Sequence, residues 1–154
     1  MDSLRDDEEL FSSLELINEK VPFHNVLGIK VKSMSFDRVQ LLFKMRDEFI
    51  GNYFHGSLHG GVISSIIDVT GGYAAFLAAQ KKRSCKTLEE KLSWIRKLGT
   101  INLRVDYLRP GLGNEFVSTA YNLKTGKKVA VVRIELHNDS NELIAVGTGS
   151  YNIA

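Results

Sequence analysis

The pattern of apolar and polar positions predicts two helical segments and six strands. Apolar side chains recur at helical spacing near the amino end, so we expect a short amphipathic helix within residues 1–20 that ends before Pro22. Residues 60–80 are apolar nearly all round, which predicts a long helix covered on both sides. The other apolar runs are short and bounded by turn residues, which is typical of strands. The expected strands are residues 29–34, 38–45, 100–108, 115–123, 128–136 and 142–151.

The links between these elements indicate how the strands are arranged. Residues 46–58 are expected to form a loop before the long helix, whereas the last four strands are joined by short segments rich in turn residues. Short links favour consecutive strands that lie side by side and antiparallel. The order helix, two strands, long helix, four strands therefore predicts one α+β domain over residues 1–154, with an antiparallel sheet beside a single apolar helix.

Residues 81–97 form a charged connection with seven basic and two acidic side chains. Thr87 offers an N-cap for a short helix there, with Glu90 three residues later as its partner. A basic segment can bind phosphates, but a solvated surface is the commoner meaning of such a run. The whole chain has a formal net charge of only +2, which argues against a nucleic-acid-binding protein.

Composition narrows the class of protein further. The chain has 154 residues, 44% of them hydrophobic, which fits one globular domain with a real core. Cys85 is the single cysteine, so an internal disulfide or a multi-cysteine metal site is excluded, as expected for a reducing cytoplasm. The acidic amino end does not resemble a secretory signal. We expect a cytoplasmic protein and interpret residues 60–80 as a buried helix, not a membrane span, because polar residues and glycines interrupt them.

Asp68 is the most informative residue, because it is the only ionisable side chain between residues 60 and 80. An ionised carboxylate in apolar surroundings is costly unless something pairs with it or uses it. On a helical projection Asp68 lies within a stripe of small residues that leaves room for a ligand or another backbone. That stripe comprises Gly61, Ser64, Ser65, Asp68, Gly71, Gly72 and Ala75.

Two interpretations of Asp68 remain open from the pattern alone. The first is an ion pair with a buried arginine or lysine, for example Arg104 or Arg133, with the glycines serving helix packing alone. The second is a reactive carboxylate, favoured by the helix start at His59–Gly61. Free N–H groups and the positive end of the helix dipole stabilise the negative charge that develops on a carbonyl oxygen under attack.

Helix geometry limits how these groups can cooperate. Gly60 and Asp68 are eight residues apart, which is roughly 12 Å along the axis, whereas both should lie within about 3 Å of reacting atoms. One helix therefore cannot supply both groups to one substrate. Two antiparallel copies can, which predicts a two-fold homodimer with two composite sites.

The motifs Leu58-His59-Gly60-Gly61-Val62, Asp68 nine positions after the histidine, and the strand that ends Tyr107-Leu108-Arg109-Pro110 occur in a specific order and spacing. Together they resemble the phenylacetate-degradation-type (PaaI-like) branch of the hot-dog-fold acyl-CoA thioesterases, over roughly residues 20–153. The resemblance implies a hot-dog fold, with a six-stranded antiparallel sheet wrapped around one long central helix. It also implies hydrolysis of acyl-CoA or a related acyl thioester by a homodimer or homotetramer, with coenzyme A as part of the substrate and no cofactor.

The same resemblance implies roles for particular residues. Asp68 would be the general base or nucleophile, the Gly60 N–H would polarise the thioester carbonyl, and Thr100 would assist beside the carboxylate. Asn52 would hold the water or the carbonyl, although the asparagine of the family usually lies six residues before the histidine and Tyr53 holds that position here. His59 would either orient the turn or transfer a proton.

Candidate substrate contacts follow from the same segments. Gly61 and Ser65 lie on the small-residue stripe, and the apolar loop residues Phe49, Ile50, Tyr53, Phe54 and Leu58 could form an acyl pocket. Four cations near strand ends could meet the phosphates of coenzyme A, namely Arg109, Lys124, Lys127 and Lys128. The histidine spacing suggests no metal site. Two rival functions are a hydratase of the same fold and a non-catalytic acyl-CoA-binding or regulatory protein.

Overall fold

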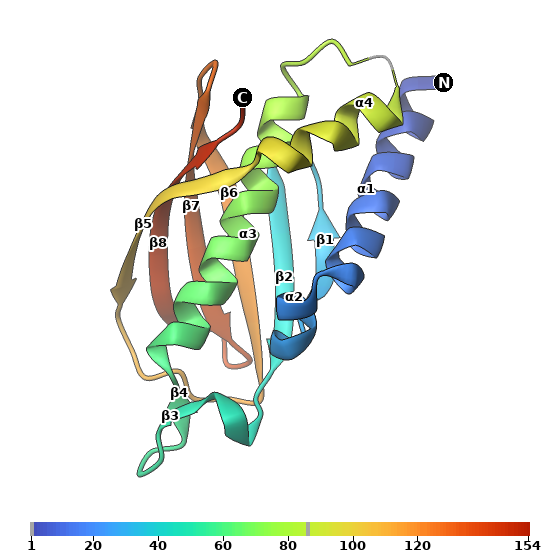
Figure 1. Ribbon diagram of the computed structural model, residues 1–154. Helices are drawn as coiled ribbons and strands as arrows, with labels where there is room; N and C mark the ends of the chain where they lie inside the picture. The colour runs from blue at the N-terminus through green and yellow to red at the C-terminus, as the bar shows by residue number, and fades with distance from the viewer. Residues whose placement is uncertain (1, 86) are drawn as a thin grey trace.

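The protein is a two-layer α+β structure in which a curved antiparallel sheet carries its helices on one face (Figure 1). The computed structural model describes residues 2–85 and 87–154. The helices are α1 (Asp2–Lys20), α2 (Pro22–Leu27), the 3-10 turn η1 (Asp47–Phe49), α3 (Gly60–Gln80), α4 (Leu88–Ser93) and the 3-10 turn η2 (Trp94–Lys97). The strands are β1 (Lys30–Met34), β2 (Arg38–Lys44), β3 (Ile50–Asn52), β4 (Ser57–Leu58), β5 (Gly99–Tyr107), β6 (Glu115–Thr125), β7 (Val129–Asn138) and β8 (Leu143–Asn152).

The main sheet has six strands in the order β1-β2-β6-β7-β8-β5, and each neighbouring pair is antiparallel. The expectation that short links join neighbouring strands is wrong for β5 and β6. β5 pairs with β8 at the sheet edge, and the link after it returns the chain to the middle of the sheet. Gly111 in this link accepts a hydrogen bond from the N–H of Leu58, so β4 holds the link across the end of the sheet.

Helix α3 packs across β6, β7 and β8, which places the long apolar segment in the core. The Thr70 hydroxyl of α3 and the Ser118 hydroxyl of β6 are hydrogen-bonded at 2.7 Å, and both residues are fully buried. Gly147 of β8 allows this close approach, because a Cβ there would lie 2.5 Å from Ile67. α3 has the length and mean hydropathy (1.5) of a membrane span, but 61% of that stretch is buried inside the fold. Its apolar composition is explained by packing against the sheet.

The amino-terminal segment contains two helices where one was expected. Leu10 and Leu14 of α1 are completely buried, as their spacing predicts. Pro22 does end the first helix, but it also begins α2, because proline suits the first helical turn, where its missing N–H is not needed. Gly28 then ends α2 in the left-handed conformation (φ 66°), which glycine adopts without strain.

The expected loop over residues 46–58 contains the turn η1 and the small β3–β4 hairpin. Those strands have three and two residues, too few for an alternating pattern to be seen in the sequence. The charged connection holds α4 with Thr87 as N-cap, as expected, because the Thr87 hydroxyl accepts from the Glu90 N–H at 3.1 Å.

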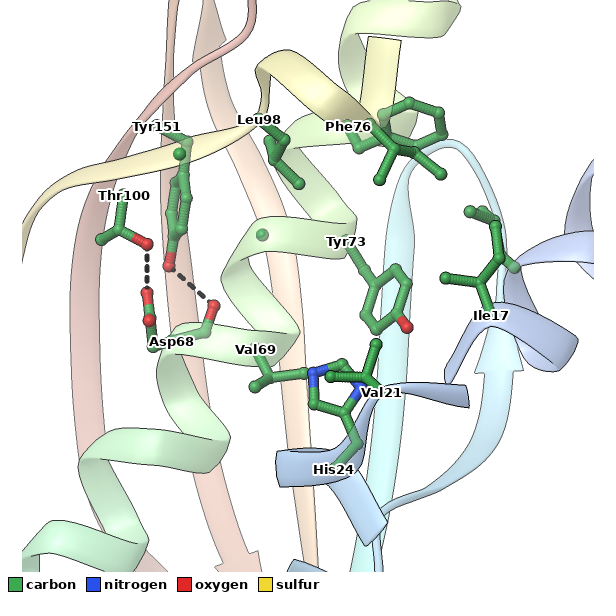
Figure 2. Close-up of a pocket in the computed structure, with 14 residues that line it drawn as sticks. Ile17, Val21, His24, Asp68, Val69, Tyr73, Phe76, Leu98, Thr100 and Tyr151 are labelled. Atoms are coloured by element: carbon green, nitrogen blue, oxygen red, sulfur yellow. Dashed lines mark hydrogen bonds between the residues drawn. The ribbon is translucent and has the colours of Figure 1, made fainter. Parts of the chain in front are cut away.

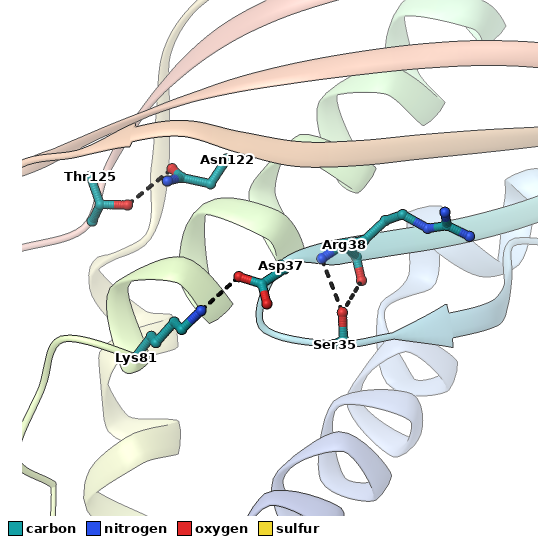
Figure 3. Close-up of polar contacts among 6 residues, drawn as sticks. All are labelled: Ser35, Asp37, Arg38, Lys81, Asn122 and Thr125. Atoms are coloured by element: carbon teal, nitrogen blue, oxygen red, sulfur yellow. Dashed lines mark hydrogen bonds and ion pairs between the residues drawn. The ribbon is translucent and has the colours of Figure 1, made fainter.

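Polar contacts fasten the end of the sheet near the carboxyl end of α3 (Figure 3). In the β1–β2 turn the Ser35 hydroxyl accepts from the Arg38 N–H at 3.0 Å, and Asp37 forms an ion pair with Lys81 at 2.7 Å. Lys91 of α4 lies 3.8 Å from Asp7 of α1. Two lysines of the basic connection are thus paired with acids of the same chain, which fits a surface segment.

Candidate active site

Asp68 and Thr100 form the centre of the candidate site. Asp68 lies half-buried midway along α3, and Thr100 lies at the start of β5, where the edge strand passes the helix. The Thr100 hydroxyl donates to the Asp68 carboxylate at 2.8 Å (Figure 2). The carboxylate is therefore oriented by a neutral donor.

Neither of the two arginines considered as ion-pair partners of Asp68 pairs with it. Arg104 pairs with Asp106 at 3.1 Å, and Arg133 lies 3.8 Å from Glu135. Both arginines therefore pair with acids two residues along their own strands. This favours the interpretation of Asp68 as a reactive group.

Tyr151 of β8 supports Asp68 from the sheet, and sequence reasoning did not identify it. Its hydroxyl donates to the backbone carbonyl oxygen of Asp68 at 3.1 Å (Figure 2). Burial raises the pKa of this hydroxyl, and the nearby negative charge of Asp68 raises it further, so the group remains a donor. Gly71 makes room for the ring, because a Cβ there would lie 2.1 Å from the Tyr151 oxygen.

The amino end of α3 carries a free backbone donor. The first four N–H groups of a helix have no partner inside the helix. The Gly61 N–H donates to His59 Nδ1 at 2.8 Å, and those of Val62 and Ile63 reach the His59 carbonyl at 3.0 and 3.2 Å. Of these first four N–H groups, that of Gly60 is the one without a hydrogen-bond partner within residues 2–85 and 87–154. His59 acts as the N-cap, which agrees with the orienting role considered for it.

One face of α3 between its amino end and Asp68 is only partly covered by the chain. Gly61 is exposed, and Ser64, Ser65 and Asp68 are half-buried. The two serine hydroxyls donate back to the Gly61 carbonyl, at 3.2 and 2.6 Å. The other half of the expected stripe is covered, since Gly71, Gly72 and Ala75 are all buried. The small residues thus serve packing in one half of the helix and leave an open face in the other.

The loop residues expected at the site do not lie beside Asp68 in the single chain; Phe49 and Ile50 instead line a separate cavity with His59, Gly61 and Ser65. Asn52 ends β3, and its side-chain oxygen accepts from the Phe54 N–H at 3.1 Å, so it shapes the hairpin turn. Tyr53 and Phe54 stack on each other at the tip and are 78% and 79% exposed. Phe49 and Leu58 are buried core residues.

The four candidate phosphate-binding cations lie at opposite ends of the sheet. Arg109 follows β5 near the amino end of α3, where the Tyr107 hydroxyl donates to the Gly60 carbonyl at 3.1 Å. Lys124 lies near the end of β6, and Lys127 and Lys128 lie in the β6–β7 turn. This turn is close to the carboxyl end of α3, as the hydrogen bond from Lys82 to the Thr125 carbonyl shows. Within one chain these two groups cannot hold the same phosphates.

A cavity of about 220 Å³ opens beside the Asp68–Thr100 pair (Figure 2). Apart from Asp68, Thr100, His24 and two tyrosines its lining is apolar. The apolar part comprises Leu14, Ile17, Val21, Val69, Gly72, Phe76, Ile95, Leu98 and Gly99. None of the expected acyl-pocket residues lines it. The apolar stripe in the sequence of α1 predicts that this helix is buried. It does not predict which part of the protein the helix packs against.

Residues 55–145, which contain Asp68 and Thr100, match the family model for the thioesterase superfamily. The chain belongs to the thioesterase superfamily. It is 37% identical over 145 residues to the medium/long-chain acyl-CoA thioesterase YigI of Escherichia coli K12, covering 92% of this chain and 94% of YigI. The helix, the sheet order and the family together establish the hot-dog fold, and membership makes the chain a thioester hydrolase.

Solved structures agree with this assignment. A protein of Shewanella oneidensis related to the superfamily has a TM-score of 0.91 and 40% identity, covering 96% of this chain and 97% of that chain. A protein of Syntrophus aciditrophicus, provisionally described as a thioesterase, has a TM-score of 0.86 and 52% identity, covering 97% and 99%. The E. coli PaaI protein of the phenylacetic acid degradation operon has a TM-score of 0.76 but only 20% identity, so it is alike in fold alone.

Proposed function

We propose that this thioesterase hydrolyses medium- or long-chain acyl-CoA in the cytoplasm, with Asp68 as its catalytic carboxylate. The observation that carries the proposal is the Asp68–Thr100 contact at one side of a largely apolar cavity. The similarity to YigI supports the substrate class, whereas the PaaI-like motifs support the choice of catalytic residues.

The chemistry can follow two balanced routes. In the first, Asp68 removes a proton from water, whose oxygen attacks the thioester carbonyl; the C–S bond then breaks, and coenzyme A leaves as a thiolate that takes up a proton. In the second, the Asp68 carboxylate attacks the carbonyl, and water hydrolyses the resulting anhydride. Label in the Asp68 side chain after single turnover in ¹⁸O-water would identify the anhydride route, because water that attacks the aspartyl carbon of the anhydride leaves its oxygen there.

The second proposed element is the oxyanion donor, the Gly60 N–H of a partner subunit. Eight residues separate Gly60 from Asp68 on the same straight helix, so one α3 cannot place both on one substrate. The open face of α3 and the edge strand β5, which carries Thr100 and the exposed Ile101, lie next to each other and provide a surface for a two-fold partner. Such dimers could pair further into tetramers.

Thiol release from a series of acyl-CoA esters tests the proposed activity. Asp68→Asn keeps the size of the side chain and removes the base, so kcat should fall about 10²- to 10⁴-fold. Asp106→Asn is the matched control, because Asp106 is an acid on β5 that pairs with Arg104. Unchanged turnover by Asp68→Asn would refute the role of Asp68. Tight binding without thiol release by the wild type would instead support a non-catalytic acyl-CoA-binding protein.

Mixing two inactive variants tests the composite site. Gly60→Pro removes the N–H at the first helical position, where proline is accepted, and Asp68→Asn removes the carboxylate. A mixed dimer retains one intact site, so random mixing should restore about a quarter of wild-type activity. Circular dichroism checks that each variant is folded. No recovery on mixing two folded dimers would contradict the shared site.

A further inference from the structure

The cavity beside Asp68 is built by three parts of the chain that are far apart in sequence. Its floor is a face of α3 that runs from Asp68 through Gly72 to Phe76. One wall comes from α1 and α2, with Ile17, Val21 and His24, and the other from η2, β5 and β8 (Figure 2). The polar pair Asp68–Thr100 lies at one side of this space, and Phe76 and Ile17 lie at the other.

We propose that this cavity within a single chain binds the acyl chain of the substrate and that α1 limits its length. The proposal rests on the proposed thioesterase function. A thioester whose carbonyl meets Asp68 has its alkyl chain next to the apolar floor, and burying that chain against the apolar lining is favourable. The occupant is therefore a straight acyl chain, with the coenzyme A portion outside.

The size of the cavity suggests a medium-length chain. An apolar cavity of about 150 Å³ holds one benzene molecule, so a cavity of about 220 Å³ has room for roughly nine carbon atoms. The floor agrees with this, because Asp68 and Phe76 are eight residues apart, or roughly 12 Å along the helix. Longer chains would have to displace α1, whose Leu14 and Ile17 close the far wall.

Gly72 allows a test that does not threaten the fold. A Cβ at this position would lie 3.8 Å from both Leu98 and Tyr151, which is ordinary contact distance. Gly72→Ala therefore adds one methyl group to the cavity without a clash. Ile17→Ala does the opposite, because a smaller side chain in the far wall enlarges the cavity. Leu16→Ala is the matched control, because Leu16 is the neighbouring α1 residue but is 58% exposed to solvent.

The experiment measures kcat/KM for acyl-CoA esters from four to sixteen carbons in the wild type and the three variants. The same series of S-alkyl-CoA thioethers, which cannot be hydrolysed, is measured for binding by calorimetry. Gly72→Ala should lower kcat/KM for the longest accepted chain about tenfold or more, with short chains unaffected. Ile17→Ala should shift the optimum to longer chains, and Leu16→Ala should leave the profile unchanged.

The two readouts separate the failure of each proposal. Turnover with an identical chain-length profile in all folded variants would overturn the acyl cavity and leave the thioesterase function standing. Absent turnover with thioether binding that shifts with Gly72→Ala and Ile17→Ala would support the cavity and overturn hydrolysis as the function. A profile that shifts equally in Leu16→Ala would also count against the cavity, because that change lies outside it.

Discussion

Tyr151 donates a hydrogen bond to the backbone carbonyl oxygen of Asp68 at 3.1 Å, so β8, the last strand in the chain, contacts the central helix at the candidate base. This contact is independent of the one that Thr100 makes with the Asp68 carboxylate. The side chain and the backbone of Asp68 are thus fixed from two different strands, β5 and β8.

Tyr151→Phe should lower the free energy of unfolding by about 1 kcal/mol, because it removes one buried neutral hydrogen bond. Activity should also fall, since the helix turn at Asp68 loses a support. Tyr121→Phe is a suitable control, because it removes a tyrosine hydrogen bond to Glu135 on the neighbouring strand. Chemical denaturation and kcat measure the two effects. Equal activity in both variants would mean that Tyr151 has only a structural role.

Thr100→Val keeps the shape of the side chain but removes the donor to Asp68. Hydrogen bonds to charged groups contribute about 1.5–3 kcal/mol, so kcat/KM should fall roughly 10- to 100-fold. Thr100→Ser retains a hydroxyl and should recover most of the activity. A serine variant as poor as the valine variant would show that the threonine methyl group matters more than the hydrogen bond.

His59→Asn tests whether His59 orients the helix start or transfers a proton. Asparagine is among the best N-cap residues, so this variant should keep its stability, whereas His59→Ala should lose about 1 kcal/mol. If His59 acts only as a cap, His59→Asn should retain activity across the pH range. A stable asparagine variant that is inactive would assign His59 a chemical role.

His24 should make the fold less stable in mild acid. Burial lowers the pKa of His24 below its usual 6.5, against a smaller opposing effect of the Asn18 backbone. The unfolded chain therefore binds this proton at a higher pH than the folded chain, and stability falls as the pH drops below about 6.5. His24→Gln cannot be protonated and should lose part of this dependence. His55→Gln, at the exposed β3–β4 turn, should behave like the wild type.

The adjacent glycines of α3 should respond in opposite ways to the same substitution. Gly71→Ala places a methyl group against the buried Tyr151 ring and should cost roughly 1–3 kcal/mol. Gly72→Ala has room and should stabilise the helix by up to about 1 kcal/mol. Thermal unfolding of the two variants tests this difference. Similar melting temperatures would contradict the packing described for Tyr151.

The sequence predicted the elements well where local signals agree. The bounds of α3 follow from an apolar run that begins after His59 and stops at Lys81, and Thr87 marks α4 by its capping chemistry. The partner of β5 could not be predicted, because strand order depends on contacts between residues far apart in the chain. The β3–β4 hairpin was missed since its strands are too short to show alternation.

The residues of the candidate site likewise divide into those with a signal in the sequence and those brought together only by contacts between distant parts of the chain. Asp68 was identified because a lone carboxylate in an apolar helix is conspicuous, and Thr100 because of the family resemblance. Tyr151 gave no signal, since an aromatic residue near the end of a strand is usually core. Ile17 and His24 were likewise not predicted to share a cavity with Asp68, because only the packing of α1 and α2 against α3 brings them together.

The segment that matches the superfamily, residues 55–145, supplies Asp68 and Thr100, whereas the α1–α2 wall of the cavity precedes it in the chain. The proposed acyl cavity therefore takes one wall from outside the matched segment, whereas its floor, with Gly72 and Phe76, lies inside it. Grafting the first 28 residues of a relative onto this chain should shift the preferred chain length by changing this one wall, while Asp68 and Thr100 stay in place. Substitutions in α1 and α2 can in the same way alter the cavity without touching the strand and helix that hold the candidate base.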